Sequence, residues 1–144
     1  MIHSPATVVA AFLVAGGLFG GVTAWTYSVG YEPDADGVEA EHVTLFDTAG
    51  LKDAKLLADG TGIYRHGLQC LVRSQARSDG WTKAEAILAA LTVCRGRATT
   101  DQVTISATTY TIHNASQQGP TFSLGLDGAK RRTTHSLNFL MSIT

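Results

Sequence analysis

Charged side chains are missing from the start of this 144-residue chain, because residues 1–31 contain no Lys, Arg, Asp or Glu. The chain also has only three prolines and two cysteines, and its net charge is −1. This balance argues against the strong overall basicity of many nucleic-acid-binding proteins, and no nucleic-acid partner is expected. About 110 residues follow the uncharged segment, which is enough for one compact domain with one core.

Motifs that carry catalysis or bind cofactors are also missing. Gly60-Thr61-Gly62 lacks the further glycine of a dinucleotide-binding fingerprint, and the chain contains no Walker lysine motif and no GxSxG. The five histidines have no HExxH or other ligand spacing: His3, His42, His66, His113 and His135. We therefore expect no enzymatic activity, no cofactor and no metal, and we assign no catalytic, cofactor-binding or metal-binding residues.

The uncharged segment is strongly apolar from Thr7 to Val29. At about 1.5 Å per residue, a helix of that length spans the hydrocarbon core of a bilayer. Trp25, Tyr27 and Tyr31 lie at one end of the run, where amphipathic rings prefer the membrane interface. The sequence predicts a hydrophobic helix over residues 1–31 that lies in a membrane or in the centre of a filament.

Four glycines inside this run predict close packing of one helix on another. Gly16 and Gly20 are four residues apart, as are Gly17 and Gly21, so each pair would lie on one narrow helix face. Such glycines would destabilise a lone helix in water, which favours a helix partner. A cleaved signal peptide, cut ahead of Trp25, is the alternative, but no Lys or Arg precedes the apolar run.

The rest of the chain divides into an acidic joint over 32–48 and a globular domain over 49–144. The joint contains Pro33, Asp34, Asp36 and Gly37, which break regular structure. Helical spacing of apolar residues predicts helices over 49–58 and 63–77. A third helix is predicted from the capping box Thr82-Lys83-Ala84-Glu85.

After Arg97 the pattern changes to alternating β-branched and apolar residues, which predicts strands from Val103, over 121–126 and over 137–143, with a loop over 114–120. The predicted fold class is α+β. We expect a long hydrophobic N-terminal helix followed by a small domain of two to three helices and a three-stranded antiparallel sheet.

This order of elements, with a helix containing Arg and Ala followed by VTISATTYTI, a loop and a closing apolar strand, resembles the type IV pilin superfamily. Within it, the chain resembles TadE-like or type IVb-like minor pilins. The resemblance implies a subunit of a fimbrium or type IV pilus, a cell-surface filament that serves in cell adhesion, with the N-terminal helix at its centre.

Cys70 and Cys94 fall on the second and third predicted helices. In an exported domain a disulfide bond between them is one interpretation, and two buried free thiols are the other. The short basic cluster Lys130, Arg131 and Arg132 is interpreted as a solvated hairpin tip, with contact to an anionic partner as the alternative.

Together these observations predict a structural, pilin-like subunit that assembles with identical or homologous subunits in a helical filament, after a stage in the membrane. A single-pass accessory subunit of a membrane protein complex is the alternative, and a secreted domain with a removed signal peptide is the third. The expected location is a cell-surface filament, or a membrane anchor with an exported domain. Residues 32–59 carry a net charge of −6 and residues 60–144 a net charge of +5, which suits contacts between the acidic and basic ends of neighbouring subunits.

Overall fold

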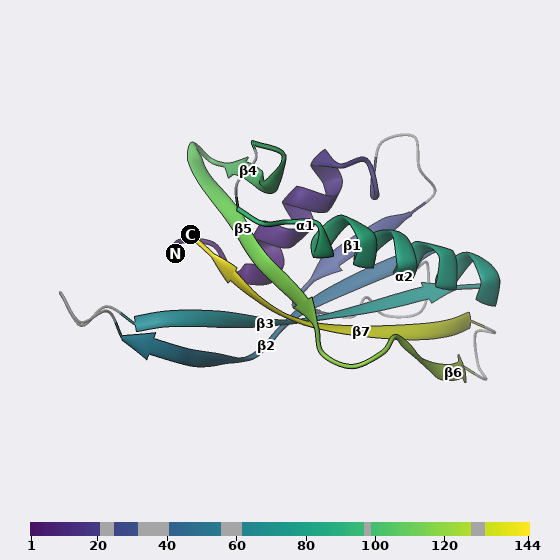
Figure 1. Cartoon of the computed structure of the whole chain (residues 1–144). Coiled ribbons are helices and arrows are strands. Elements are labelled where there is room, and N and C mark those ends of the chain that lie inside the picture. The colour runs from purple at the N-terminus through teal and green to yellow at the C-terminus, as the bar shows by residue number, and fades with distance from the viewer. Residues whose placement is uncertain (21–24, 32–40, 56–61, 97–98, 128–131) are drawn as a thin grey trace.

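A computed structural model describes the chain except for residues 21–24, 32–40, 56–61, 97–98 and 128–131 (Figure 1). In chain order, the elements are α1 (Pro5–Ala15), β1 (Thr26–Val29), β2 (His42–Lys55), β3 (Gly62–Ser74), α2 (Arg77–Thr92), the 3-10 turn η1 (Thr99–Asp101), β4 (Gln102–Ile105), β5 (Thr108–Gln117), β6 (Phe122–Asp127) and β7 (Arg132–Ile143).

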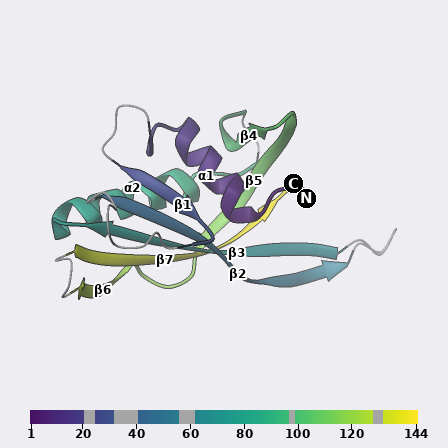
Figure 2. The same cartoon turned by 180° about the vertical axis from the view of Figure 1, so that it is seen from behind.

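One seven-stranded sheet organises the molecule. Its strands follow the order β1-β2-β3-β7-β5-β4, and β6 pairs with the first half of β7. The pairings are antiparallel except the one between β1 and β2. Both helices lie on the same face of the sheet, as the two opposite views show (Figures 1 and 2). The chain therefore forms a helical layer over a curved sheet.

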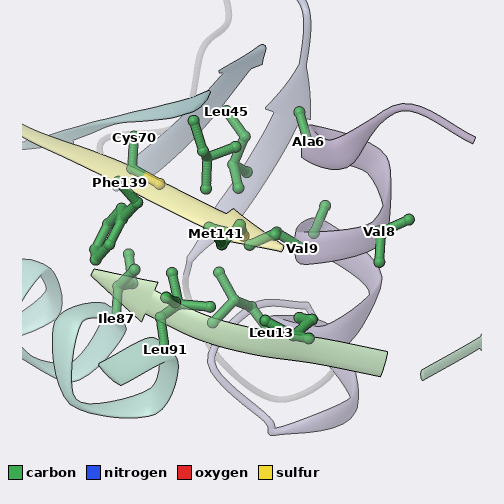
Figure 3. Packing of buried hydrophobic residues seen from close by; sticks show 14 of the residues in the cluster. Ala6, Val8, Val9, Leu13, Leu45, Cys70, Ile87, Leu91, Phe139 and Met141 are labelled. Atoms are coloured by element: carbon green, nitrogen blue, oxygen red, sulfur yellow. The ribbon is translucent and has the colours of Figure 1, made fainter. Parts of the chain in front are cut away.

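The core lies between the helices and the inner face of the sheet (Figure 3). Strand residues alternate between the two faces, so every second side chain of the central strands points toward the helices. The fully buried members include Leu45, Leu68, Cys70, Leu137, Phe139 and Met141 from the strands, and Val9, Leu13, Ile87 and Leu91 from the helices. Full burial of a large apolar side chain stabilises the fold by about 1.5–3 kcal/mol.

The prediction of a long N-terminal helix is wrong. Helix α1 ends at Ala15, Gly16 forms its C-cap, and the chain returns as strand β1 from Thr26. Five residues of α1 are buried, which explains why the segment is apolar and uncharged: it packs in the protein's own core. Among the residues that the structure describes, no helix is long and apolar enough to cross a membrane. The expected transmembrane helix is therefore also wrong.

The helices predicted over 49–58 and 63–77 are wrong as well, because these segments belong to β2 and β3. The two strands pair along their whole length, from His42 with Arg73 to Lys55 with Gly62. Strand β3 is also held on its other side by β7. Pairing on both sides outweighs the short helical spacing of apolar residues that suggested helices.

The C-terminal elements agree better with expectation. Strands β4, β6 and β7 occupy the segments predicted to be extended, although β5 continues to Gln117 through the predicted loop. Helix α2 exists but begins at Arg77, before the capping box; Thr82 lies inside it and donates a hydrogen bond to the carbonyl of Ser78. The described residues form two α-helices and a seven-stranded sheet, so the predicted fold class of a long helix plus a three-stranded sheet is wrong.

Candidate assembly surfaces

The glycines predicted to pack helices lie at the end of α1. Gly16 is the C-cap residue, while Gly17 and Gly20 adopt positive φ angles of 74° and 68°. Gly21 lies outside the described residues. Positive φ suits glycine, so Gly17 and Gly20 serve here to turn the chain from α1 toward β1.

The two cysteines are free, buried thiols. Cys70 lies on β3 in the core, and Cys94 follows α2, where its thiol donates to the carbonyl of Ala90 at 3.4 Å. Burial raises the pKa of Cys70 to about 12, and burial together with the charge of Asp101 raises that of Cys94 to about 11. Thiols with such high pKa values react slowly at neutral pH.

A two-stranded ribbon extends from one end of the sheet (Figure 1). The pairing of β3 with β7 ends at His66, whereas β2 and β3 continue to pair as far as Lys55 and Gly62. We call residues 47–55 and 62–65 the arm. An isolated hairpin is at best marginally stable in water. A ribbon that extends beyond its sheet is therefore stabilised either by close packing at its base or by contact with a partner.

The base of the arm is built from two glycines and a bulge. The register between β2 and β3 shifts between Thr48 and Leu51. A side-chain carbon at Gly67 would lie 2.5 Å from the carbonyl oxygen of Ala49, and one at Gly50 would overlap the carbonyl of Arg65. A bulge bends a strand and increases its twist, and the glycines allow the two backbones to approach closely there. The sequence thus specifies the direction in which the arm leaves the body.

Beyond this base, the arm exposes large apolar side chains on both faces. Leu51 is 54% exposed and Tyr64 51% exposed. Leu51 pairs with Arg65 and Lys52 with Tyr64, so the two apolar side chains point to opposite faces. Lys52 Nζ lies 5.6 Å from the centre of the Tyr64 ring. Among the residues beyond the bulge whose side chains the structure describes, each face of the arm therefore carries one exposed apolar residue and one basic residue.

Asp47, the first residue of the arm, binds the start of α1: its Oδ1 accepts a hydrogen bond of 2.8 Å from the backbone N–H of Ala6. Replacement by alanine leaves that N–H without its charged acceptor, so we expect Asp47→Ala to lower the free energy of unfolding by about 1–2 kcal/mol. Urea unfolding measures this change. Glu85→Ala, on the exposed face of α2, is the control and should change stability by less than about 0.5 kcal/mol. Equal effects of the two variants would contradict the assigned role.

At the other end of the sheet, β6 presents an apolar edge. Phe122, Leu124 and Leu126 are 44%, 58% and 62% exposed. Among the described strands, β6 pairs with β7 alone, which leaves its outer edge open. Edge strands are usually protected by lysine, proline, a bulge or short length; β6 has six residues and contains neither lysine nor proline, although its register with β7 shifts between Ser123 and Gly125. An exposed apolar edge of this kind is typical of an interaction site.

A third exposed feature is a hollow beside the first turns of α2, lined by Arg77, Ser78, Trp81 and Thr82. The indole of Trp81 meets the ring of the buried His135 edge-on, at 5.6 Å between ring centres. Gly80 allows this approach, because a side-chain carbon there would lie 2.9 Å from His135. Neither ring nitrogen of His135 has a hydrogen-bond partner among the described residues.

A buried polar cluster lies on the sheet face opposite the helices. His42 bonds to two hydroxyl groups, Thr26 through Nδ1 at 2.7 Å and Ser28 through Nε2 at 2.9 Å. Burial, reinforced by the charges of Arg73 and Arg132, lowers the pKa of His42 to about 4. The imidazole is therefore neutral near pH 7, and the cluster is a structural element of the fold at that pH.

The sequence predicts that acidic and basic residues lie at opposite ends of the protein, and the structure differs from this prediction. Glu41 and Arg132 lie at the same end of the sheet, where Ser74 donates a hydrogen bond to Glu41 and Thr133 donates one to the carbonyl of Ser74. Arg132 is buried, so it does not form a solvated hairpin tip; Lys130 and Arg131 lie outside the described residues. The acidic and basic segments therefore approach each other within one chain at these residues.

Comparison with known proteins finds similarity in fold only. No protein-family model matches the chain, and no curated protein matches its sequence. A similar solved structure is a chain from the virion of a native gene transfer agent particle, with a TM-score of 0.60 and 15% sequence identity. The match covers 97% of this chain and 94% of that one. At this identity the likeness concerns the fold.

Proposed function

We propose that this chain is a structural subunit of a virion-like particle in which copies of it contact one another. The proposal rests on the arm. This ribbon has a closely packed base and exposes apolar side chains on both of its faces. Such a ribbon gains stability when a neighbouring subunit covers it. The similar fold in a virion particle, which extends over nearly the whole of both chains, supports the same class of function.

The hypotheses of a pilin-like filament subunit and of a membrane accessory subunit both include assembly with other subunits. Both also require a hydrophobic helix over residues 1–31. Helix α1 is 11 residues long and buries its apolar residues within the chain. No observation on the described residues favours either hypothesis over a virion subunit. Assembly through exposed surfaces of the folded domain replaces assembly through a helix.

The proposed function predicts that the purified full-length chain forms multimers of regular shape as its concentration rises. Light scattering after size-exclusion chromatography would give the number of copies, and negative-stain electron microscopy would show a ring or a short tube. Mass spectrometry of particles released by the source cells should detect the chain. A chain that stays monomeric at millimolar concentration and is missing from such particles would refute the proposal.

A further inference from the structure

We infer that the arm of one copy lies against strand β6 of the next copy, in a head-to-tail contact that repeats around a ring or along a tube. This inference deepens the proposed function and rests on it. It begins from position: the arm and β6 lie at opposite ends of the sheet in both views of the molecule (Figures 1 and 2). Two different surfaces at opposite ends of one chain can meet only between copies, and such contacts either close into rings or extend into filaments.

The dimensions of the two surfaces agree. At about 3.4 Å per residue, the six residues of β6 extend over about 20 Å. The arm strand from Thr48 to Lys55 is bulged and pairs with six residues of β3, from Gly67 to Gly62, which also extend over about 20 Å. Strand β6 can therefore be covered along its whole length by the arm of a neighbour. The outer edge of β6 is open among the described strands, so backbone pairing can add to side-chain contact.

The chemistry of the two surfaces also agrees. Strand β6 offers three apolar side chains and contains one charged residue, Asp127. The arm exposes Leu51 and Tyr64, and its sequence contains three bases, Lys52, Lys55 and Arg65, and two acids, Asp47 and Asp53; Asp47 already binds the start of α1. Apolar groups can thus meet apolar groups, and the arm, which has one more base than acids, approaches a strand that carries one acid and no base.

The area of the contact predicts how it behaves. Each of the five apolar side chains is about half exposed and offers on the order of 100 Å². Only one of Leu51 and Tyr64 can face β6, so these side chains supply on the order of 100 Å² from the arm and 300 Å² from β6, both below the roughly 800 Å² per partner of a stable standard interface. One such contact holds two copies weakly, whereas a closed ring gives every copy two contacts. We therefore expect assembly to be concentration-dependent, with few isolated dimers.

Engineered disulfides in the full-length chain test the contact. The native thiols can stay, because Cys70 and Cys94 are buried. We expect a chain with both Leu51→Cys and Leu124→Cys, or with both Tyr64→Cys and Leu124→Cys, to give a ladder of covalent multimers on mild oxidation. The pair that reacts identifies the face of the arm that lies against β6. The matched control, Val93→Cys with Leu124→Cys, places an equally exposed thiol at the end of α2 and should give at least tenfold less product.

Each result has a defined meaning. If the chain forms regular multimers and neither arm position cross-links to Leu124→Cys, the inference is wrong while the proposed function stands. Dimers formed by Leu124→Cys alone would indicate pairing of β6 with β6 and would also overturn it. If Lys52→Glu lowers binding to duplex DNA and leaves assembly unchanged, the arm binds nucleic acid instead. A chain that neither assembles nor occurs in particles would refute the proposed function together with the inference.

Discussion

Replacement of Gly67 by valine is expected to lower the free energy of unfolding by about 3 kcal/mol or more, since it forces large atoms into closely packed backbone. A side-chain carbon at this position would lie 2.5 Å from the carbonyl oxygen of Ala49 and 3.0 Å from that of Thr48. Backbone atoms of a paired strand cannot rotate away as a flexible side chain can. The base of the arm must therefore open, which breaks the pairing between β2 and β3 next to the core residue Leu68.

Urea unfolding monitored by circular dichroism measures the loss. Gly16→Ala is the matched control: the nearest atoms to an added carbon there are 3.5 Å away, and φ is −77°. We expect that control to change the free energy of unfolding by less than about 1 kcal/mol. Where Gly67→Val still folds, it should also reduce assembly, because the arm then leaves the body in another direction. A Gly67→Val protein as stable as the control would disprove the close approach at the base of the arm.

The sequence predicted the C-terminal half of the fold better than the N-terminal half. Alternation at Val103 and Ile105, and at Leu137, Phe139 and Met141, led to strands that the structure contains. Here the period of two is long and regular, and it belongs to strands that bury one face. Helix α2 was also recognised, although its start was placed too late.

The N-terminal error has a physical cause. An apolar segment without charges has the same composition whether it is buried in lipid or in the core of its own domain. Helix length decides between the two, and the glycines from Gly16 to Gly21 were interpreted as helix packing when Gly17 and Gly20 turn the chain. Their positive φ angles depend on the position of β1 beside β2, which no local pattern shows.

The arm and the edge strand could not be predicted for a related reason. Val43 and Leu45 alternate on β2, and Leu68, Cys70 and Val72 alternate on β3, so a period of two was present in both segments. The spacing of Leu51, Ala54 and Leu57 also fits one face of a helix, and this competing pattern leads to the wrong prediction. Strand β6 was expected, but the exposure of its side chains depends on which strand lies beside it, and this depends on tertiary pairing.

Acid should destabilise this protein through His42. Its pKa lies at about 4 in the folded chain and near 6.5 when unfolded, so the unfolded state binds a proton first as the pH falls. The stability that the neutral imidazole provides is complete above pH 6.5 and is lost progressively between pH 6.5 and pH 4. With part of the interaction screened by solvent, a difference of this size corresponds to a loss on the order of 1–3 kcal/mol. His66, whose pKa is also lowered, chiefly by burial, contributes in the same direction.

The comparison of the wild-type chain with His42→Gln isolates this contribution. Glutamine keeps a donor and an acceptor for Thr26 and Ser28 but does not titrate, so the variant should lose less stability than the wild type from pH 7 to pH 4. Chemical unfolding at several pH values measures the two slopes. Because burial is the main cause of the low pKa and the charge of Arg73 comes second, Arg73→Met should raise the pKa of His42 only in part, which NMR titration can follow. Parallel slopes for the wild type and His42→Gln would show that His42 does not control acid stability. The loss of stability in acid would then have to come from other titrating groups.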